Sequence, residues 1–175
     1  MLLSFFFWKD LIKMKDFKRE VYYGTGKYQP LDFWENLHMP ASLATMLKYL
    51  VRAGKKDGES KAKDLTKAEN YWNVFLQNIQ DHAMFSYSNT YSSTHFYSYK
   101  LQAYSISEFI EYLKEDGYDE DTIECIHDIL RLGLRLVTVG YQVNSYTEYL
   151  NLIMLENVTN IKLSFNKILK EVGTD

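Results

Sequence analysis

A row of basic side chains dominates one predicted helical stretch of the chain. Lys48, Arg52 and Lys55 are spaced i, i+4 and i+7, which places them on one face of a helix, and Lys56 follows directly. Arginine offers a planar fork for phosphate oxygens, and lysine offers a mobile point charge. Because like charges in a row repel one another, we expect a bound anion or an acidic side chain to neutralise them.

A second polar row follows on the next predicted helix. Asp64, Lys67 and Tyr71 are spaced i, i+3 and i+7, so they share a helical face. If the two helices form a hairpin, the two rows face one another across a cleft, and Asp64 can orient one of the basic side chains. The spacing alone is equally compatible with a charged face that is simply solvated.

Both rows lie within a longer sequence pattern. Residues 46–58 have the sequence MLKYLVRAGKKDG, and residues 64–71 have the sequence DLTKAENY. This pattern resembles the signature of a small bacteriophage family labelled nucleotide kinase-like, which includes a nucleoside monophosphate kinase without a P-loop. The resemblance covers roughly residues 27–76. The positions that it carries over are Lys48, Tyr49, Arg52, Lys55, Lys56, Asp64, Lys67 and Tyr71.

The resemblance implies nucleotide handling in the cytoplasm of a phage-infected bacterium. Two pairs depart from the family pattern: Lys27-Tyr28 stands for His-Tyr, and Ala44-Thr45 stands for Gly-Asn. The missing histidine and asparagine are suited to positioning a phosphate or a base. We therefore favour a binding protein that sequesters a nucleotide, including a cyclic nucleotide signal of host defence. The alternative is an enzyme, either a P-loop-independent nucleoside monophosphate kinase or an all-α nucleoside triphosphate pyrophosphohydrolase.

Two weaker groups of residues are relevant to these alternatives. An enzyme of the pyrophosphohydrolase type would hold Mg²⁺ with carboxylates on adjacent helices, whereas simple binding requires no cofactor. The acidic candidates are Glu108, Glu111, Glu124 and Asp128, although the same spacing suits a solvated face. In the Tyr/Ser-rich segment 85–104, Tyr97 and Tyr99 could stack a nucleobase, or the segment could pack or mediate assembly.

Composition limits the class of protein. The chain has 175 residues and a net charge of −3, so a binder of long nucleic acids is not indicated. No stretch approaches the roughly 20 apolar residues of a membrane span, and the single cysteine, Cys125, excludes an internal disulfide. We expect a cytoplasmic protein without membrane contact. An apolar N-terminus and a surplus of aromatic residues favour a homo-oligomer.

The apolar spacing predicts one mostly α domain over residues 1–175. An αα-hairpin lies within 27–84, followed by the insertion 85–104, which is a short β-hairpin or an ordered loop, and by a helical extension over 105–175. The predicted helices run from an Asp32 cap to Met39, from a Ser42 cap to Gly54, from Lys61 to Met84, from a Ser105 cap to Asp116, from Asp119 through Leu134, and from a Ser145 cap to Val172.

Overall fold

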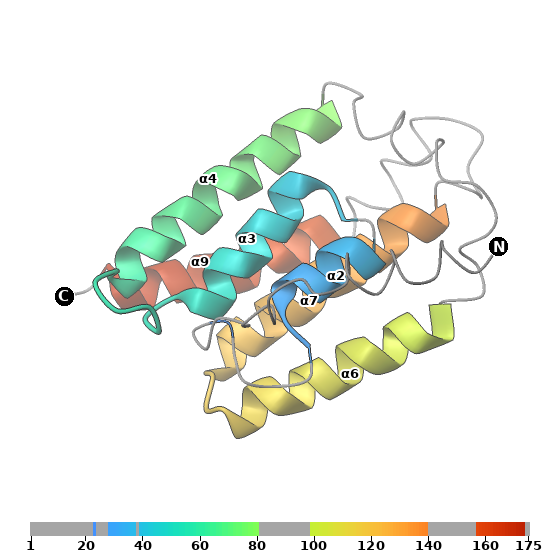
Figure 1. Ribbon diagram of the computed structural model, residues 1–175. Helices are drawn as coiled ribbons and strands as arrows, with labels where there is room; N and C mark the ends of the chain where they lie inside the picture. The colour runs from blue at the N-terminus through green and yellow to red at the C-terminus, as the bar shows by residue number, and fades with distance from the viewer. Residues whose placement is uncertain (1–22, 24–27, 38, 81–98, 140–156, 174–175) are drawn as a thin grey trace, which may run out of the picture.

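The computed structural model describes residues 23, 28–37, 39–80, 99–139 and 157–173. The regular elements in these ranges are all helices, which confirms the mostly α fold (Figure 1). They are α2 (Pro30–Asn36), α3 (Ala41–Arg52), α4 (Lys61–Gln80), α6 (Tyr99–Glu115), α7 (Glu120–Val139) and α9 (Thr159–Val172).

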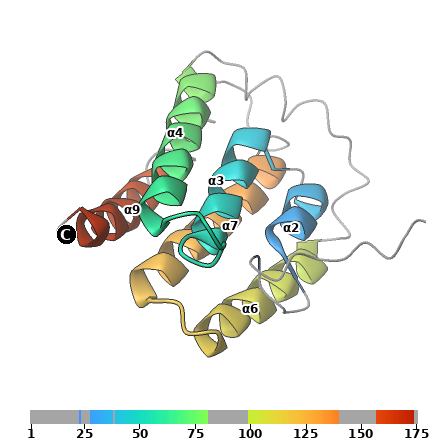
Figure 2. The ribbon, with the colours of Figure 1, turned by 60° about the vertical axis from the view of Figure 1, so that its left-hand side comes forward.

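Helix α3 lies at the centre of the packing. It contacts α4, α2 and α7, while α7 also contacts α6 and α9, and α4 meets α9. Figures 1 and 2 show α4 alongside α3, with α2 on the other side of α3 and α6 farther out. Because α2 and α4 flank α3, the solvent-facing side chains of α3 lie next to both neighbours.

The predicted helical faces of the hairpin are confirmed. On α3 the apolar positions at helical spacing are buried, namely Leu43, Met46, Leu47, Leu50 and Val51. On α4 the buried positions are Leu65, Ala68, Trp72, Phe75 and Ile79. Gly54 follows the end of α3 with φ of 77°, a conformation that glycine adopts without steric cost. The chain therefore leaves α3 where the sequence predicts.

The predicted starts of the first two helices are wrong. Helix α2 begins at Pro30 with Gln29 as its N-cap, and Asp32 is the N3 partner that accepts a hydrogen bond of 2.7 Å from the Gln29 amide. Proline suits the first helical position because its φ is already helical and its missing N–H is not needed there. Helix α3 likewise begins at Ala41, directly after Pro40, so Ser42 lies inside the helix and is buried.

The C-terminal half departs from the prediction at one helix start. Helix α6 begins at Tyr99, so the Ser105 cap is wrong and the end of the supposed insertion is helical. Segment 85–98, with its predicted β-hairpin or loop, lies outside the described residues. Asp119 does cap α7, because its carboxylate accepts a hydrogen bond of 2.7 Å from the Thr122 amide. The predicted Ser145 cap also lies outside the described residues, and α9 ends at Val172 as predicted.

The segment between α2 and α3 is held against α7. A Cβ atom added at Gly133 of α7 would lie 2.9 Å from Met39 Cγ, which is too close for any other residue without a shift. Met39 is fully buried there. Met39, which lies in the connection between α2 and α3, therefore packs closely against α7.

Candidate functional site

Arg52 forms a buried ion pair with Asp64. Its Nε and Nη2 atoms donate to the two carboxylate oxygens at 3.0 and 2.5 Å, and the exposed fractions of the two residues are 5% and 0%. The hydrogen bond to Asp64 raises the pKa of Arg52 although burial opposes the charge. The acidic side chain foreseen as one way to neutralise the row is therefore present. The Arg52 side chain is therefore held in an ion pair inside the protein.

The structure does not place Lys55, the last residue of the predicted basic row, on helix α3 with Lys48 and Arg52. Helix α3 ends at Arg52, so the spacing i, i+7 no longer describes one helical face, and Lys56 is in the same loop. The Lys55 ammonium bonds the Asp116 carboxylate at the end of α6 and lies 3.7 Å from the centroid of the Tyr118 ring. Tyr118 in turn donates a hydrogen bond of 2.7 Å to the Val51 carbonyl. Lys55 thus joins two loops.

The two predicted rows meet in direct contact around one aromatic ring. Tyr49 stacks on Tyr71 with centroids 5.8 Å apart. Lys48 Nζ, Arg52 Cζ and Lys67 Nζ lie 5.7, 4.7 and 5.4 Å from the Tyr49 centroid. We call these five residues the Tyr49 cluster. No open cleft is needed for the rows to meet, because the tyrosines fill the space between α3 and α4.

The Tyr49 cluster carries an excess of positive charge. Its cations face two carboxylates: Asp64, which is bonded to Arg52, and Glu59, which lies 3.5 Å from Lys67. Glu59 is also shared with Lys63 at 2.9 Å. Within the described ranges, no carboxylate forms an ion pair with Lys48. An anion that approaches Lys48 would therefore meet a locally positive surface.

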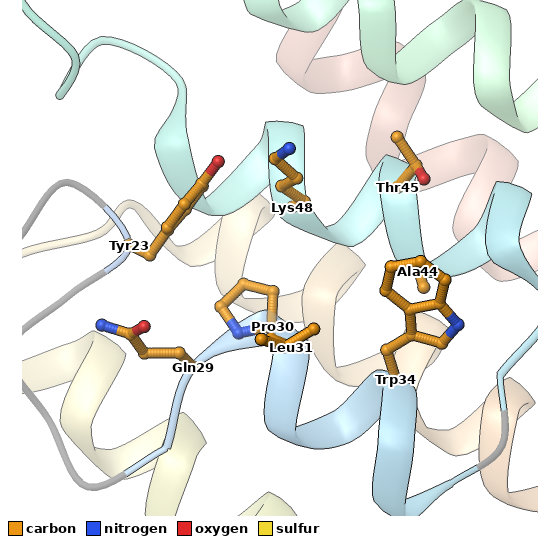
Figure 3. A pocket seen from close by; sticks show the side chains of 8 residues that line it. All are labelled: Tyr23, Gln29, Pro30, Leu31, Trp34, Ala44, Thr45 and Lys48. Carbon is orange, nitrogen blue, oxygen red and sulfur yellow. The ribbon is translucent and has the colours of Figure 1, made fainter. Parts of the chain in front are cut away.

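A pocket of about 210 Å³ opens between α2 and α3, and Lys48 lies on its wall (Figure 3). The wall is mostly apolar, and α2 contributes Leu31 and Trp34, each 43% exposed. Lys48 therefore belongs both to the pocket and to the Tyr49 cluster. The lining residues are Tyr23, Gln29, Pro30, Leu31, Trp34, Ala44, Thr45 and Lys48.

The α2 side of this pocket was missed by sequence reasoning. Leu31 and Trp34 are spaced i, i+3 on a face of α2 that differs from the buried face of Phe33 and Leu37. A second apolar pair on a short helix was the feature of the sequence that could have indicated an exposed apolar surface. Ala44 and Thr45, which replace the Gly-Asn pair of the resembling family, both line the pocket.

The four acidic candidates do not line this pocket. Tyr97 and the side chain of Tyr99 lie outside the described residues. Among the residues that the structure describes, no group of three His, Cys, Asp or Glu side chains could hold a metal ion. Glu111 pairs with Lys114 at 2.8 Å, Glu124 with Lys167 at 3.8 Å and Asp128 with Arg131 at 4.0 Å. Glu108 lies on α6, half-buried.

The Cys125 thiol should be chemically inert in the folded protein. It is fully buried in α7, and burial raises its pKa to about 12. Since the thiolate is the nucleophile, we expect iodoacetamide at pH 8 to alkylate Cys125 only as fast as the protein unfolds. Mass spectrometry over a urea series measures this rate. Rapid modification without urea would contradict the burial of the thiol.

Comparisons with known proteins give one match. Residues 18–73 match the model of a family described as protein of unknown function (DUF3310). This range contains α2, α3 and the first part of α4, so it includes most of the pocket and the Tyr49 cluster. No curated protein and no solved structure matches the chain. Over the described helices, none is long and apolar enough to cross a membrane.

Proposed function

We propose that this chain binds a nucleotide, with the base in the pocket between α2 and α3 and the phosphate at Lys48. The observation that carries the proposal is the position of Lys48, a cation without a carboxylate partner among the described residues, between an apolar pocket and the positive Tyr49 cluster. A nucleotide has the matching shape, since a flat ring and an anionic group are joined by a short linker.

The phosphate end is supported by charge. Lys48 Nζ and Lys67 Nζ each lie within 6 Å of the Tyr49 ring centroid. A charge-assisted hydrogen bond from lysine to phosphate contributes about 1.5–3 kcal/mol. Arg52 is only 5% exposed and its charge is balanced by Asp64, so we assign it no contact with the phosphate. The proposed phosphate site is therefore smaller than the four-residue row predicted from the sequence.

The base end is supported by the apolar wall. Pro30, Leu31 and Trp34 present apolar surface to the pocket, and stacking of a base on an aromatic ring contributes about 1–3 kcal/mol. A largely exposed tryptophan beside a pocket is costly for the free protein, since its apolar surface remains in water. A bound ring would cover that surface.

The biological role in this proposal rests on the family resemblance. We propose that the chain acts as a homo-oligomer in the cytoplasm of an infected bacterium and sequesters a nucleotide signal of host defence. Sequestration leaves the ligand intact, whereas a kinase or pyrophosphohydrolase would change it. Incubation with nucleoside mono-, tri- and cyclic phosphates, with and without Mg²⁺, followed by anion-exchange chromatography separates these cases. Intact nucleotide supports sequestration, and rapid turnover would move the assignment to an enzyme.

We expect Lys48→Met to weaken nucleotide binding by about tenfold or more, because it removes the phosphate-facing charge and keeps the apolar stem. Isothermal titration calorimetry with a nucleotide panel measures the change. The fold should be unaffected, since Lys48 makes no ion pair with a described residue.

The matched control is Lys55→Met. Lys55 belongs to the same predicted row, but it bonds Asp116 instead of facing the pocket, so its replacement should leave the affinity within about twofold. Equal losses in the two variants would favour the original row over the pocket. Unchanged affinity in Lys48→Met would remove Lys48 from the site.

A further inference from the structure

The Thr45 hydroxyl, at the pocket wall, already uses its proton in a hydrogen bond within the protein. Its Oγ1 atom donates a hydrogen bond of 2.6 Å to the Ala41 carbonyl. A hydroxyl has one proton and two acceptor lone pairs, so Thr45 has no proton left for a ligand. While that bond is kept, Thr45 offers a ligand only its acceptor lone pairs.

Lys48 has the opposite polarity one turn further along α3. An ammonium group has donors and no acceptor. Residues three apart are neighbours on one helical face, so the α3 wall presents both an acceptor and a mobile donor. In Figure 3, Thr45 and Trp34 lie at one end of the pocket, and Tyr23 and Gln29 lie at the other.

We propose that Thr45 makes the pocket selective for nucleobases that carry an amino group on the edge facing α3. This inference rests on the proposed nucleotide function and deepens it, because it names the class of base. With the phosphate at Lys48, the ring edge near Thr45 has to supply a hydrogen-bond donor. An exocyclic amino group does so, whereas a carbonyl would place two acceptors against each other. Uracil and thymine have a ring N3–H donor, but two carbonyl acceptors flank it.

The expected discrimination is about tenfold. A hydrogen bond to a neutral partner changes affinity by a few-fold to about tenfold. Adenine, guanine and cytosine carry an exocyclic amino group, and uracil and thymine do not. The tightest nucleotide of the panel should therefore contain one of the first three bases.

The experiment compares the tightest-binding monophosphate with its analogue that lacks only the amino group, by isothermal titration calorimetry. The analogues are purine riboside monophosphate for adenine, inosine monophosphate for guanine and 2-pyrimidinone riboside monophosphate for cytosine. We expect the native protein to prefer the amino-bearing partner by about tenfold. We expect Thr45→Val to bind both partners equally, with the affinity for the analogue unchanged, and Thr45→Ser to restore the preference.

The chain offers a matched control for the substitution itself. Thr66 on α4 donates the same type of hydrogen bond, to the Ala62 carbonyl at 3.0 Å, and does not line the pocket. Thr66→Val should keep the full preference for the amino-bearing nucleotide. A thermal melt of each variant checks the fold, and Thr45→Ala serves as a second hydroxyl-free variant if Thr45→Val is unstable.

The outcomes distinguish failure of the base selectivity from failure of nucleotide binding itself. Tightest binding of a uracil or thymine nucleotide overturns the inference and leaves the nucleotide function standing. The inference is also overturned if Thr45→Val or Thr45→Ala keeps the preference for the amino-bearing nucleotide, or if the native protein shows no such preference. Binding of no nucleotide overturns the proposed function and the inference together.

Discussion

Arg52→Ala is expected to destabilise the fold by about 3–5 kcal/mol, because it leaves the Asp64 carboxylate without its charged partner in the protein interior. Asp64 has no exposed surface, and both of its oxygens accept hydrogen bonds from Arg52. Lys67, at 3.7 Å, is half-exposed and cannot replace a two-pronged guanidinium group. Urea unfolding followed by circular dichroism measures the free energy of unfolding.

Two further variants show whether the loss comes from the unpaired carboxylate. Replacing both partners, as Arg52→Met with Asp64→Leu, should recover most of the stability, because a buried pair exchanged for apolar side chains is often neutral or stabilising. Lys63→Ala removes an exposed partner of Glu59 and should cost less than about 1 kcal/mol. A loss below about 1 kcal/mol in Arg52→Ala would contradict the buried pair. The buried pair thus gives Arg52, which the sequence placed in the basic row, a role in the stability of the fold.

Trp72→Ala is expected to cost about 3–5 kcal/mol, the usual range for truncating a buried aromatic side chain. Trp72 is 4% exposed and stacks on Phe75 with ring centroids 5.5 Å apart. Its removal leaves a cavity on the buried face of α4. Since Leu47 is also fully buried, Leu47→Ala should fall in the range of about 2–5 kcal/mol. Thermal melts report both changes as a lowered Tm.

The control for these truncations lies on the same helix. Val74 is 48% exposed, so Val74→Ala removes little buried surface and replaces a β-branched residue with the best helix former. Its Tm should stay within a degree or two of the native protein. If Trp72→Ala melted as late as Val74→Ala, the helical phase of α4 would be wrong.

The sequence could predict the helices of the hairpin because their information is local. An apolar side chain every three or four residues indicates a helix that buries one face. Gly54 marks the end of the first helix of the hairpin. Helix starts were harder, because several residues near each start can serve as caps. Pro30 and Pro40 decided the starts of α2 and α3 against Asp32 and Ser42, which the capping pattern favoured.

Part of the candidate site could be predicted in the same way. The hairpin suggested that Asp64 meets one of the basic side chains, and the structure shows that this side chain is Arg52. Tyr49 and Tyr71 lie within the resembling pattern. The pocket could not be predicted, because it depends on the distance and angle between α2 and α3. Both depend on tertiary packing, including the contact of Met39 with Gly133, which lies 94 residues later in the chain.

By itself, then, the sequence determined an α-helical chain, the buried faces of α3 and α4, and a concentration of cations on the hairpin. The tertiary structure alone decided how each cation is used. Arg52 is neutralised by Asp64, Lys55 bonds Asp116 from a distant helix, and Lys48 stays at the pocket wall. The physical reason is that helical spacing specifies which face a charge occupies, whereas its partner depends on distances through space between elements.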